Sequence, residues 1–158
     1  TTIVRNFLYS ALMVLLWERL TASPDTQLAG IAARSLKEAH YHLRHARDWL
    51  VRFGDGTDES HARAQAALDH LLPYTDEFWV DSAAETAAVA QGVGVRTTAL
   101  QSDWNALVDD ALAEATLTRP AAAKGYITQG KQGVHSEHLG FVLAEMQSLA
   151  RAHPGASW

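Results

Sequence analysis

The chain has 158 residues, no cysteine, a formal net charge of -5 and 47% hydrophobic residues. The lack of cysteine excludes disulfides, thiolate metal sites, iron–sulfur clusters and a cysteine nucleophile. The composition excludes disorder and predicts one globular domain over residues 1–158, long enough to bury a core. Residues 53–118 carry a net charge of -10, which argues against a nucleic-acid-binding protein.

Residues 1–20 are predicted to form a helix, and they resemble a targeting segment only superficially. The apolar run from residue 7 to 17 is interrupted by Tyr9 and Ser10 and is shorter than the roughly 20 residues that span a bilayer. A basic leader and a small-residue cleavage site are also missing. We therefore expect a cytoplasmic protein without a membrane segment. A helix that is apolar on nearly every side is enclosed by several neighbours.

A second helix is predicted over residues 24–53, with Ser23 as N-cap, Pro24 in the first helical position and a turn at residues 54–56. Its predicted apolar stripe contains Leu28, Ile31, Ala32, Ser35, Ala39, His42, Ala46, Trp49 and Phe53. The spacing of three and four places Trp49 and Phe53 in the core. Its cations are Arg34, Lys37, Arg44, Arg47 and Arg52, and we interpret them as a solvated helix face.

The rest of the chain also has helical periodicity. A third helix is predicted over residues 57–79, with capping side chains at residues 57–60, among them Thr57 and Ser60, and a kink or break at Pro73. A loop over residues 80–96 follows, with a helical turn in its alanine-rich part. A fourth helix is predicted over residues 97–116, and residues 117–133 hold no regular helix. The predicted apolar stripe of the fourth helix contains Leu100, Trp104, Leu107, Val108, Ala111 and Ala115. Leu139 to Leu149 define a fifth. The predicted fold is therefore an all-α bundle of about five helices.

Eight histidines make a metal site a hypothesis to consider. Di-iron helical bundles use a glutamate from each of two helices and a Glu-x-x-His pair from each of the other two. Glu38 is followed at the third position by Tyr41, and His42 is one residue too far along. His135 and His138 form a second possible ligand pair near the start of the fifth helix, where Ser136 or the preceding loop is the expected cap. We predict no metal in this chain, with these four residues as the alternative ligand set.

Three runs of residues resemble a known family. They are "AARSLKEAHYHLRHARDWLVRFGDGTDES" at 32–60, "WNALVDDALAEATL" at 104–117 and "GKQGVHSEHLGFVLAEMQSLARAHPGASW" at 130–158. The chain is similar along its length to the non-catalytic subunits of bacterial phenylacetyl-CoA 1,2-epoxidase. This resemblance implies a ferritin-like fold and a structural role in a di-iron oxygenase of aerobic phenylacetate degradation. It also implies that iron is held by a partner catalytic subunit and that Glu38-Ala39-His40-Tyr41 has lost its ligand histidine.

The resemblance has three further consequences. The family carries two long helices before the position of Thr1, so we expect an N-terminally truncated chain and the C-terminal part of a ferritin-like subunit. An apolar first helix in half a bundle predicts self-association as a homodimer. Because CoA carries phosphates, Arg44 on the second helix and Lys131 in the glycine-flanked segment 130–133 are candidate CoA-binding residues. An autonomous ferritin-like metal enzyme using Glu38, His42, His135 and His138 remains the alternative.

Overall fold

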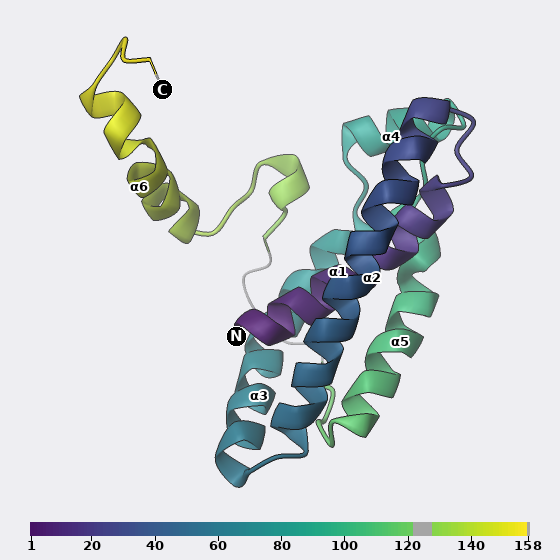
Figure 1. Ribbon diagram of the computed structural model, residues 1–158, viewed down its shortest axis with the longest axis vertical. Coiled ribbons are helices and arrows are strands. Elements are labelled where there is room, and N and C mark those ends of the chain that lie inside the picture. The colour runs from purple at the N-terminus through teal and green to yellow at the C-terminus, as the bar shows by residue number, and fades with distance from the viewer. Residues whose placement is uncertain (122–127, 158) are drawn as a thin grey trace. The chain divides into compact units, whose positions relative to one another are not determined.

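The computed structural model describes residues 1–121 and 128–157, and its ordered elements there are helices (Figure 1). The only β-type pairing in these residues is an isolated antiparallel bridge between Gln129 and Val134. The chain divides into two compact units, Thr1–Ile127 (unit 1) and Thr128–Trp158 (unit 2), and each is described by itself. The predicted all-α class is confirmed for these residues, whereas the single domain over residues 1–158 stays a prediction.

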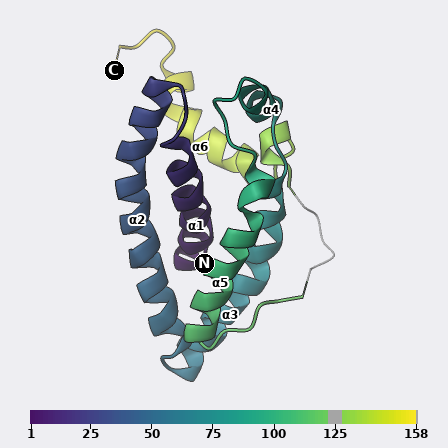
Figure 2. The same cartoon turned by 90° about the vertical axis from the view of Figure 1, so that its right-hand side faces the viewer.

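Unit 1 is a helical bundle of ferritin-like type. Its α-helices are α1 (Thr2–Leu20), α2 (Thr26–Gly54), α3 (Asp58–Leu71), α4 (Ala83–Ala90) and α5 (Gln101–Glu114). Figure 2 shows α1, α2, α3 and α5 side by side along one long axis, with α4 at one end. The alanine-rich part of the predicted loop is thus a helix of its own, α4. In the part of the chain that the structure describes, no helix is long and apolar enough to cross a membrane.

Helices α1 and α2 form the longest contact of the bundle and are joined by a short turn. Asp25, not Ser23, is the N-cap of α2, so the predicted cap is wrong. The Asp25 carboxylate accepts from the backbone N–H groups of Gln27 and Leu28, both at 3.0 Å. The Ser23 hydroxyl instead donates to the carbonyl of Val93 at 2.8 Å. This arrangement ties the α1–α2 turn to the loop after α4.

The buried side of α2 is made of small residues with one large exception, Leu50, which is 0% exposed. Ala32, Ala39 and Ala46 lie seven residues apart and are at most 7% exposed. Alanine at this spacing lets two helices approach closely, because no long side chain stands between their backbones. The predicted burial of Trp49 and Phe53 is wrong, since the two side chains are 37% and 36% exposed. Close packing along the alanine line turns these larger residues to the edge of the interface.

Helix α3 begins and ends where the sequence indicates. Thr57 and Ser60 form a reciprocal capping box at its N-terminus. The predicted break at Pro73 is confirmed, since proline has no backbone N–H to continue the α-helix. The chain continues as a 3-10 helix, η1 (Leu72–Trp79). A second 3-10 helix, η2 (Thr97–Leu100), leads directly into α5.

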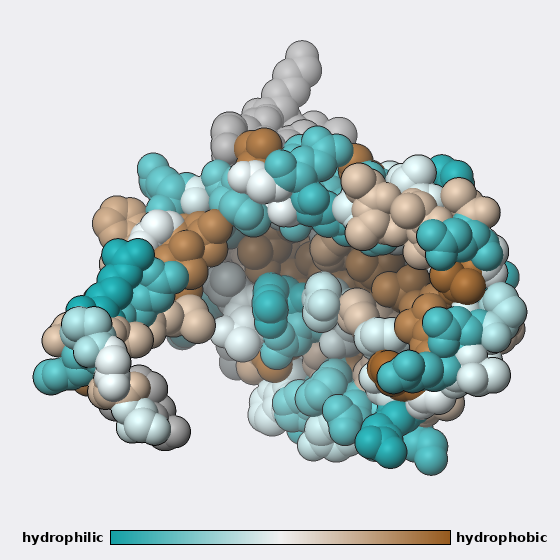
Figure 3. All heavy atoms as spheres, turned by 90° about the horizontal axis from the view of Figure 1, so that it is seen from above, coloured by the Kyte–Doolittle hydropathy of each residue, from teal (hydrophilic) through white to brown (hydrophobic). Residues whose placement is uncertain are grey.

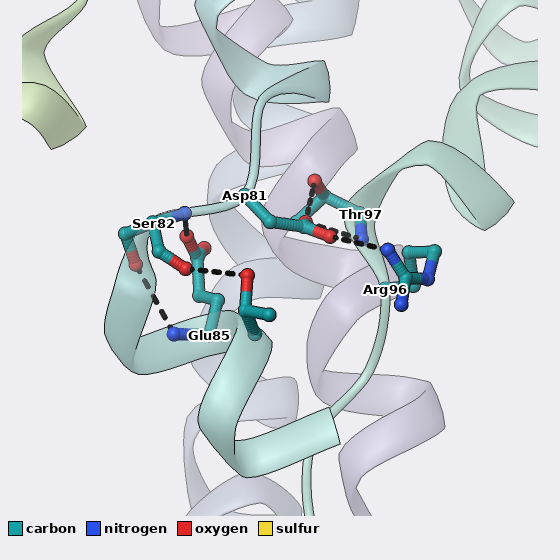
Figure 4. A network of polar contacts seen from close by, with 6 residues as sticks. Asp81, Ser82, Glu85, Arg96 and Thr97 are labelled. Atoms are coloured by element: carbon teal, nitrogen blue, oxygen red, sulfur yellow. Dashed lines mark hydrogen bonds and ion pairs between the residues drawn. The ribbon is translucent and has the colours of Figure 1, made fainter. Parts of the chain in front are cut away.

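A polar network fixes the segment that carries α4, as Figure 4 shows. The Asp81 carboxylate accepts from the Thr97 hydroxyl at 2.7 Å and from the Thr97 backbone N–H at 3.2 Å. Arg96 pairs with the other Asp81 oxygen at 3.3 Å. Ser82 and Glu85 form the capping box of α4, the Glu85 carboxylate accepting from the Ser82 N–H at 2.7 Å. Asp81, which precedes α4, is therefore bonded to Arg96 and Thr97, which follow it, and this fixes both ends of the segment.

The core of unit 1 is centred on Trp104 of α5, which is 1% exposed. Its indole N–H donates to the carbonyl of Leu8 on α1 at 3.1 Å. Trp79 and Phe78 of η1 meet its ring edge-on, with centroids 5.3 Å and 6.2 Å away. The predicted stripe of α5 is confirmed: Leu100, Trp104, Val108, Ala111 and Ala115 are buried and Leu107 packs against them.

The end of α2 approaches the end of α5 closely at Gly54. A Cβ on Gly54 would lie 2.0 Å from the Ala115 carbonyl oxygen. The Gly54 carbonyl accepts from the Thr116 hydroxyl at 3.1 Å and contacts His61 Nδ1 at 2.8 Å. Thr116 itself has a positive φ of 56°, a conformation that residues with a Cβ rarely adopt. No residue with a Cβ fits at position 54 beside Ala115, so close packing of the two helix ends requires glycine there in addition to the turn.

Unit 2 contains a short 3-10 helix, η3 (Gly130–Gln132), and helix α6 (His138–Ala152). Gly133 adopts a left-handed conformation, with φ of 80°, between the two residues of the Gln129–Val134 bridge. Glu137 is the N-cap of α6 and makes no side-chain capping bond, so the expected Ser136 cap is wrong. No residue of α6 is buried.

Candidate functional site

The candidate site of unit 1 is a groove between α1 and α2 with a volume of about 450 Å³. It is lined by Arg5, Asn6, Tyr9, Ser10, Met13, Trp17, Ser35, Glu38, Ala39, His42, His45 and Ala46. Exposed large hydrophobic residues in the described part of unit 1 are all on these two helices: Tyr9, Ile31, Tyr41, Trp49 and Phe53. Hydrophobic residues that are open at the molecular surface appear brown in Figure 3.

The groove brings together two of the predicted ligand residues, Glu38 and His42, because they lie one turn apart on α2. Both are exposed. Tyr41, which stands where a Glu-x-x-His pair requires histidine, packs on histidine rings instead. Its ring stacks on His45 with centroids 6.2 Å apart and meets His42 edge-on at 5.6 Å. The side chains of His42 and His45 therefore pack against the Tyr41 ring on the surface of α2.

The other two candidate ligands, His135 and His138, belong to unit 2. Within the described residues, no group of three or more His, Asp or Glu side chains is placed to hold a metal ion. The lining of the groove supplies a single carboxylate, Glu38. A di-iron centre in a helical bundle takes four carboxylates and two histidines, so the groove residues do not fit such a centre. The prediction that the chain binds no metal is untested by this geometry and stays a prediction.

The two candidate CoA-binding residues belong to different units. Arg44 is exposed on α2 in unit 1, and Lys131 lies in η3 of unit 2. Arg47, the neighbouring cation of α2, is engaged within the bundle, where its guanidinium contacts Asp110 at 2.8 Å and Glu114 at 2.6 Å. Burial alone would lower the pKa of Arg47, but hydrogen bonds and charge attraction from these two carboxylates raise the pKa above its ordinary value. Arg47 therefore joins α2 to α5 as a permanent cation.

A second, smaller pocket could not be predicted from the sequence, because residues far apart in the chain form it. It has a volume of about 170 Å³ and lies beside Trp79, Trp104 and Arg119. The Arg119 guanidinium lies 5.7 Å from the Trp104 ring centroid, donates to Asn105 at 2.6 Å and pairs with Asp109. Arg119 thus closes the outer side of the aromatic core. Both terminal nitrogens of its guanidinium have a partner, which is typical of a structural residue.

Fold and groove together define a class: a ferritin-like helical bundle whose described groove residues supply one carboxylate, where a di-iron centre takes four. The model of the family described as "Phenylacetic acid catabolic protein" matches residues 1–158, and the chain belongs to this family. The chain is also 43% identical over 157 residues to one of the subunits of the 1,2-phenylacetyl-CoA epoxidase of Escherichia coli (strain K12). That match covers 99% of this chain and 63% of the relative, so the chain spans less than two thirds of the relative's length. The resemblance found in the sequence is confirmed.

Proposed function

We propose that this chain is a structural, non-catalytic part of a multicomponent oxygenase that epoxidises phenylacetyl-CoA in aerobic phenylacetate degradation, in the cytoplasm. The observation that carries the proposal is its 43% identity to a subunit of the 1,2-phenylacetyl-CoA epoxidase. The single carboxylate of the α1–α2 groove, Glu38, supports a non-catalytic role. The di-iron chemistry belongs to a separate catalytic subunit, with which this chain associates.

The residues of unit 1 suit such a structural role. Ion pairs join α2 to α5 through Arg47, and α1 to α5 through Arg19 and Asp103 at 3.3 Å. Together with the buried Trp104, these contacts hold the long helices in one arrangement. A rigid bundle offers a partner a preformed surface, which lowers the entropy lost on association.

The test is co-expression with the catalytic subunit of a phenylacetyl-CoA epoxidase, followed by affinity purification and elemental analysis. We expect the two chains to co-purify and the iron to follow the catalytic subunit. This chain purified alone should hold no stoichiometric iron or zinc and should not epoxidise phenylacetyl-CoA. One metal ion per isolated chain that is lost in Glu38→Ala or His42→Ala would favour the autonomous metal enzyme instead.

We further propose that the isolated chain forms a homodimer through α1 and α2. The five exposed large hydrophobic residues of unit 1 lie on these helices, and exposed apolar surface of that kind is typical of interfaces. An isologous arrangement lets each copy cover the groove of the other. Light scattering should give twice the chain mass at micromolar concentration. Ile31→Glu should give a monomer and Ala33→Glu, on the other side of α2, should not; a wild-type monomer would refute the dimer.

A further inference from the structure

The segment 82–96, here called the strap, leaves the bundle after η1 and returns to it at η2. It contains α4, and none of its residues is buried. Of the strap, which the structure describes in full, only Val95 packs against the hydrophobic core. Opening the strap would therefore return little apolar area to water. Segments with few buried apolar contacts are the ones that open locally in a folded protein.

The strap is held in shape by bonds within itself. Ser82 and Glu85 cap the start of α4, and the backbone N–H groups of Val93 and Gly94 both donate to the Ala88 carbonyl at 3.0 Å. A Cβ on Gly94 would lie 2.8 Å from the Ala88 Cβ, so the returning chain lies directly against the helix. The eight residues of α4 are fewer than the about 12–15 that an isolated helix needs in water. We therefore expect these bonds to be lost together once the strap is released from the bundle.

Polar contacts hold the strap on the rest of unit 1. At its base, the Asp81 carboxylate accepts from the Thr97 hydroxyl at 2.7 Å and pairs with Arg96 at 3.3 Å. Figure 4 shows this carboxylate reaching from the chain before α4 to the chain after it. Farther along, the Ser23 hydroxyl of the α1–α2 turn donates to the Val93 carbonyl at 2.8 Å. The Asp81 side chain is only 9% exposed, and hydrogen bonds to a charged group are stronger than those between neutral groups.

We propose that the strap opens and closes as a unit while the bundle stays folded, and that Asp81 is the clasp that sets how often it opens. Opening exposes Thr97, which is 2% exposed in the closed form, and frees the α1–α2 turn from Val93. This end of the bundle thus presents two different surfaces, one in each state of the strap, with the packing around Trp104 unchanged. The strap and its clasp lie within unit 1 and need no partner chain.

The experiment is hydrogen–deuterium exchange of the full-length chain, measured by mass spectrometry at several low concentrations of urea. The hydrogen-bonded strap amides of Thr86, Gln91, Val93 and Gly94 are compared with the interior amides of α5. We expect the strap amides to share one opening constant that is nearly independent of urea, because a local opening exposes little surface. The α5 amides should exchange more slowly, with a steep dependence on urea.

Two variants that each remove one carboxylate test the clasp. Asp81→Ala removes the clasp itself, and Asp76→Ala, at an exposed position of η1, is the matched control. Asp81→Ala should raise the opening constant of the strap at least about tenfold, as expected for the loss of hydrogen bonds to a charged group. Asp76→Ala should leave that constant within about twofold of wild type. Thr97→Val, which removes one hydroxyl and keeps the Asp81 charge, is a milder variant and should act in the same direction.

Strap amides that follow the urea dependence of α5 would overturn the proposal, because the strap would then open only when the bundle unfolds. Unequal opening constants along the strap would show fraying from one end and no unit. Equal acceleration by Asp81→Ala and Asp76→Ala would indicate a general effect of charge. Equal acceleration of strap and α5 amides by Asp81→Ala would show that Asp81 stabilises the whole bundle and is no clasp.

Discussion

Replacing Trp104 by alanine tests the core assignment most directly. The Trp104 side chain is 1% exposed, contacts Trp79 and Phe78 through its ring, and donates its N–H to the Leu8 carbonyl. Removal of a fully buried tryptophan loses its transfer free energy and leaves a cavity, together about 3–5 kcal/mol. At about 2–4 °C for each kcal/mol in a chain of this size, the melting temperature should fall by roughly 6–20 °C.

Trp49→Ala is the matched control, because the same side chain is removed from a different environment. Trp49 is 37% exposed and its nearest aromatic and cationic partners, Phe53 and Arg52, belong to its own helix. We expect a loss of about 1–2 kcal/mol, since less apolar area returns to water and no closed cavity is left.

Both variants are measured by thermal and urea unfolding over a range of protein concentrations, so that any contribution of the homodimer to Trp49 appears as a concentration dependence. Equal losses for Trp49→Ala and Trp104→Ala at every concentration would show that α2 presents a different face to the core. A loss below about 1 kcal/mol for Trp104→Ala would refute the core assignment itself.

Three further predictions follow. Gly54→Ala should destabilise the fold by about 1–3 kcal/mol, because the added Cβ would overlap Ala115. Gly30→Ala, whose Cβ meets no neighbouring atom, should stabilise α2 by up to about 1 kcal/mol. The urea midpoints of the two variants are compared with that of the wild type. Arg47→Ala should lower the free energy of unfolding by about 0.2–1 kcal/mol, and by less at high salt. Because the pKa of Arg47 is raised, the stabilisation by its guanidinium is fully present below the unfolded-state pKa and is constant around neutral pH. A marked pH dependence of the stability difference between Arg47→Ala and wild type between pH 6 and 9 would contradict the assignment. Glu38→Ala should leave the iron and zinc content of the pure chain unchanged near zero by elemental analysis.

Local patterns in the sequence were enough for the helix class and most helix limits. Thr57 and Ser60 predicted a capped start, and Pro73 predicted the break after α3, because capping bonds and the missing proline N–H act within one turn of the chain. The stripe through Trp104 predicted the buried face of α5 for the same reason. The N-cap of α2 was misplaced because Ser23 and Asp25 are both good caps and only the path of the chain chooses between them.

The sequence also placed Glu38 and His42 together, since they share one helix, and the departure at Tyr41 could be read without a structure. It could not locate the pocket beside Trp79 and Arg119, because those residues are brought together by the packing of η1 against α5.

For this chain, sequence alone determined that it is helical, that it lacks thiol chemistry and that it resembles epoxidase subunits, because these properties reside in residue types and their local spacing. Tertiary structure decided which side of α2 is buried. Periodicity predicted one broad stripe that contained both the alanine line Ala32, Ala39 and Ala46 and the larger residues Trp49 and Phe53. Of these, the structure buries the alanine line, which packs closely on α1, and leaves the two large side chains partly exposed. A helix offers several apolar lines, and which one is covered depends on the shape of its neighbour, since interiors are close-packed.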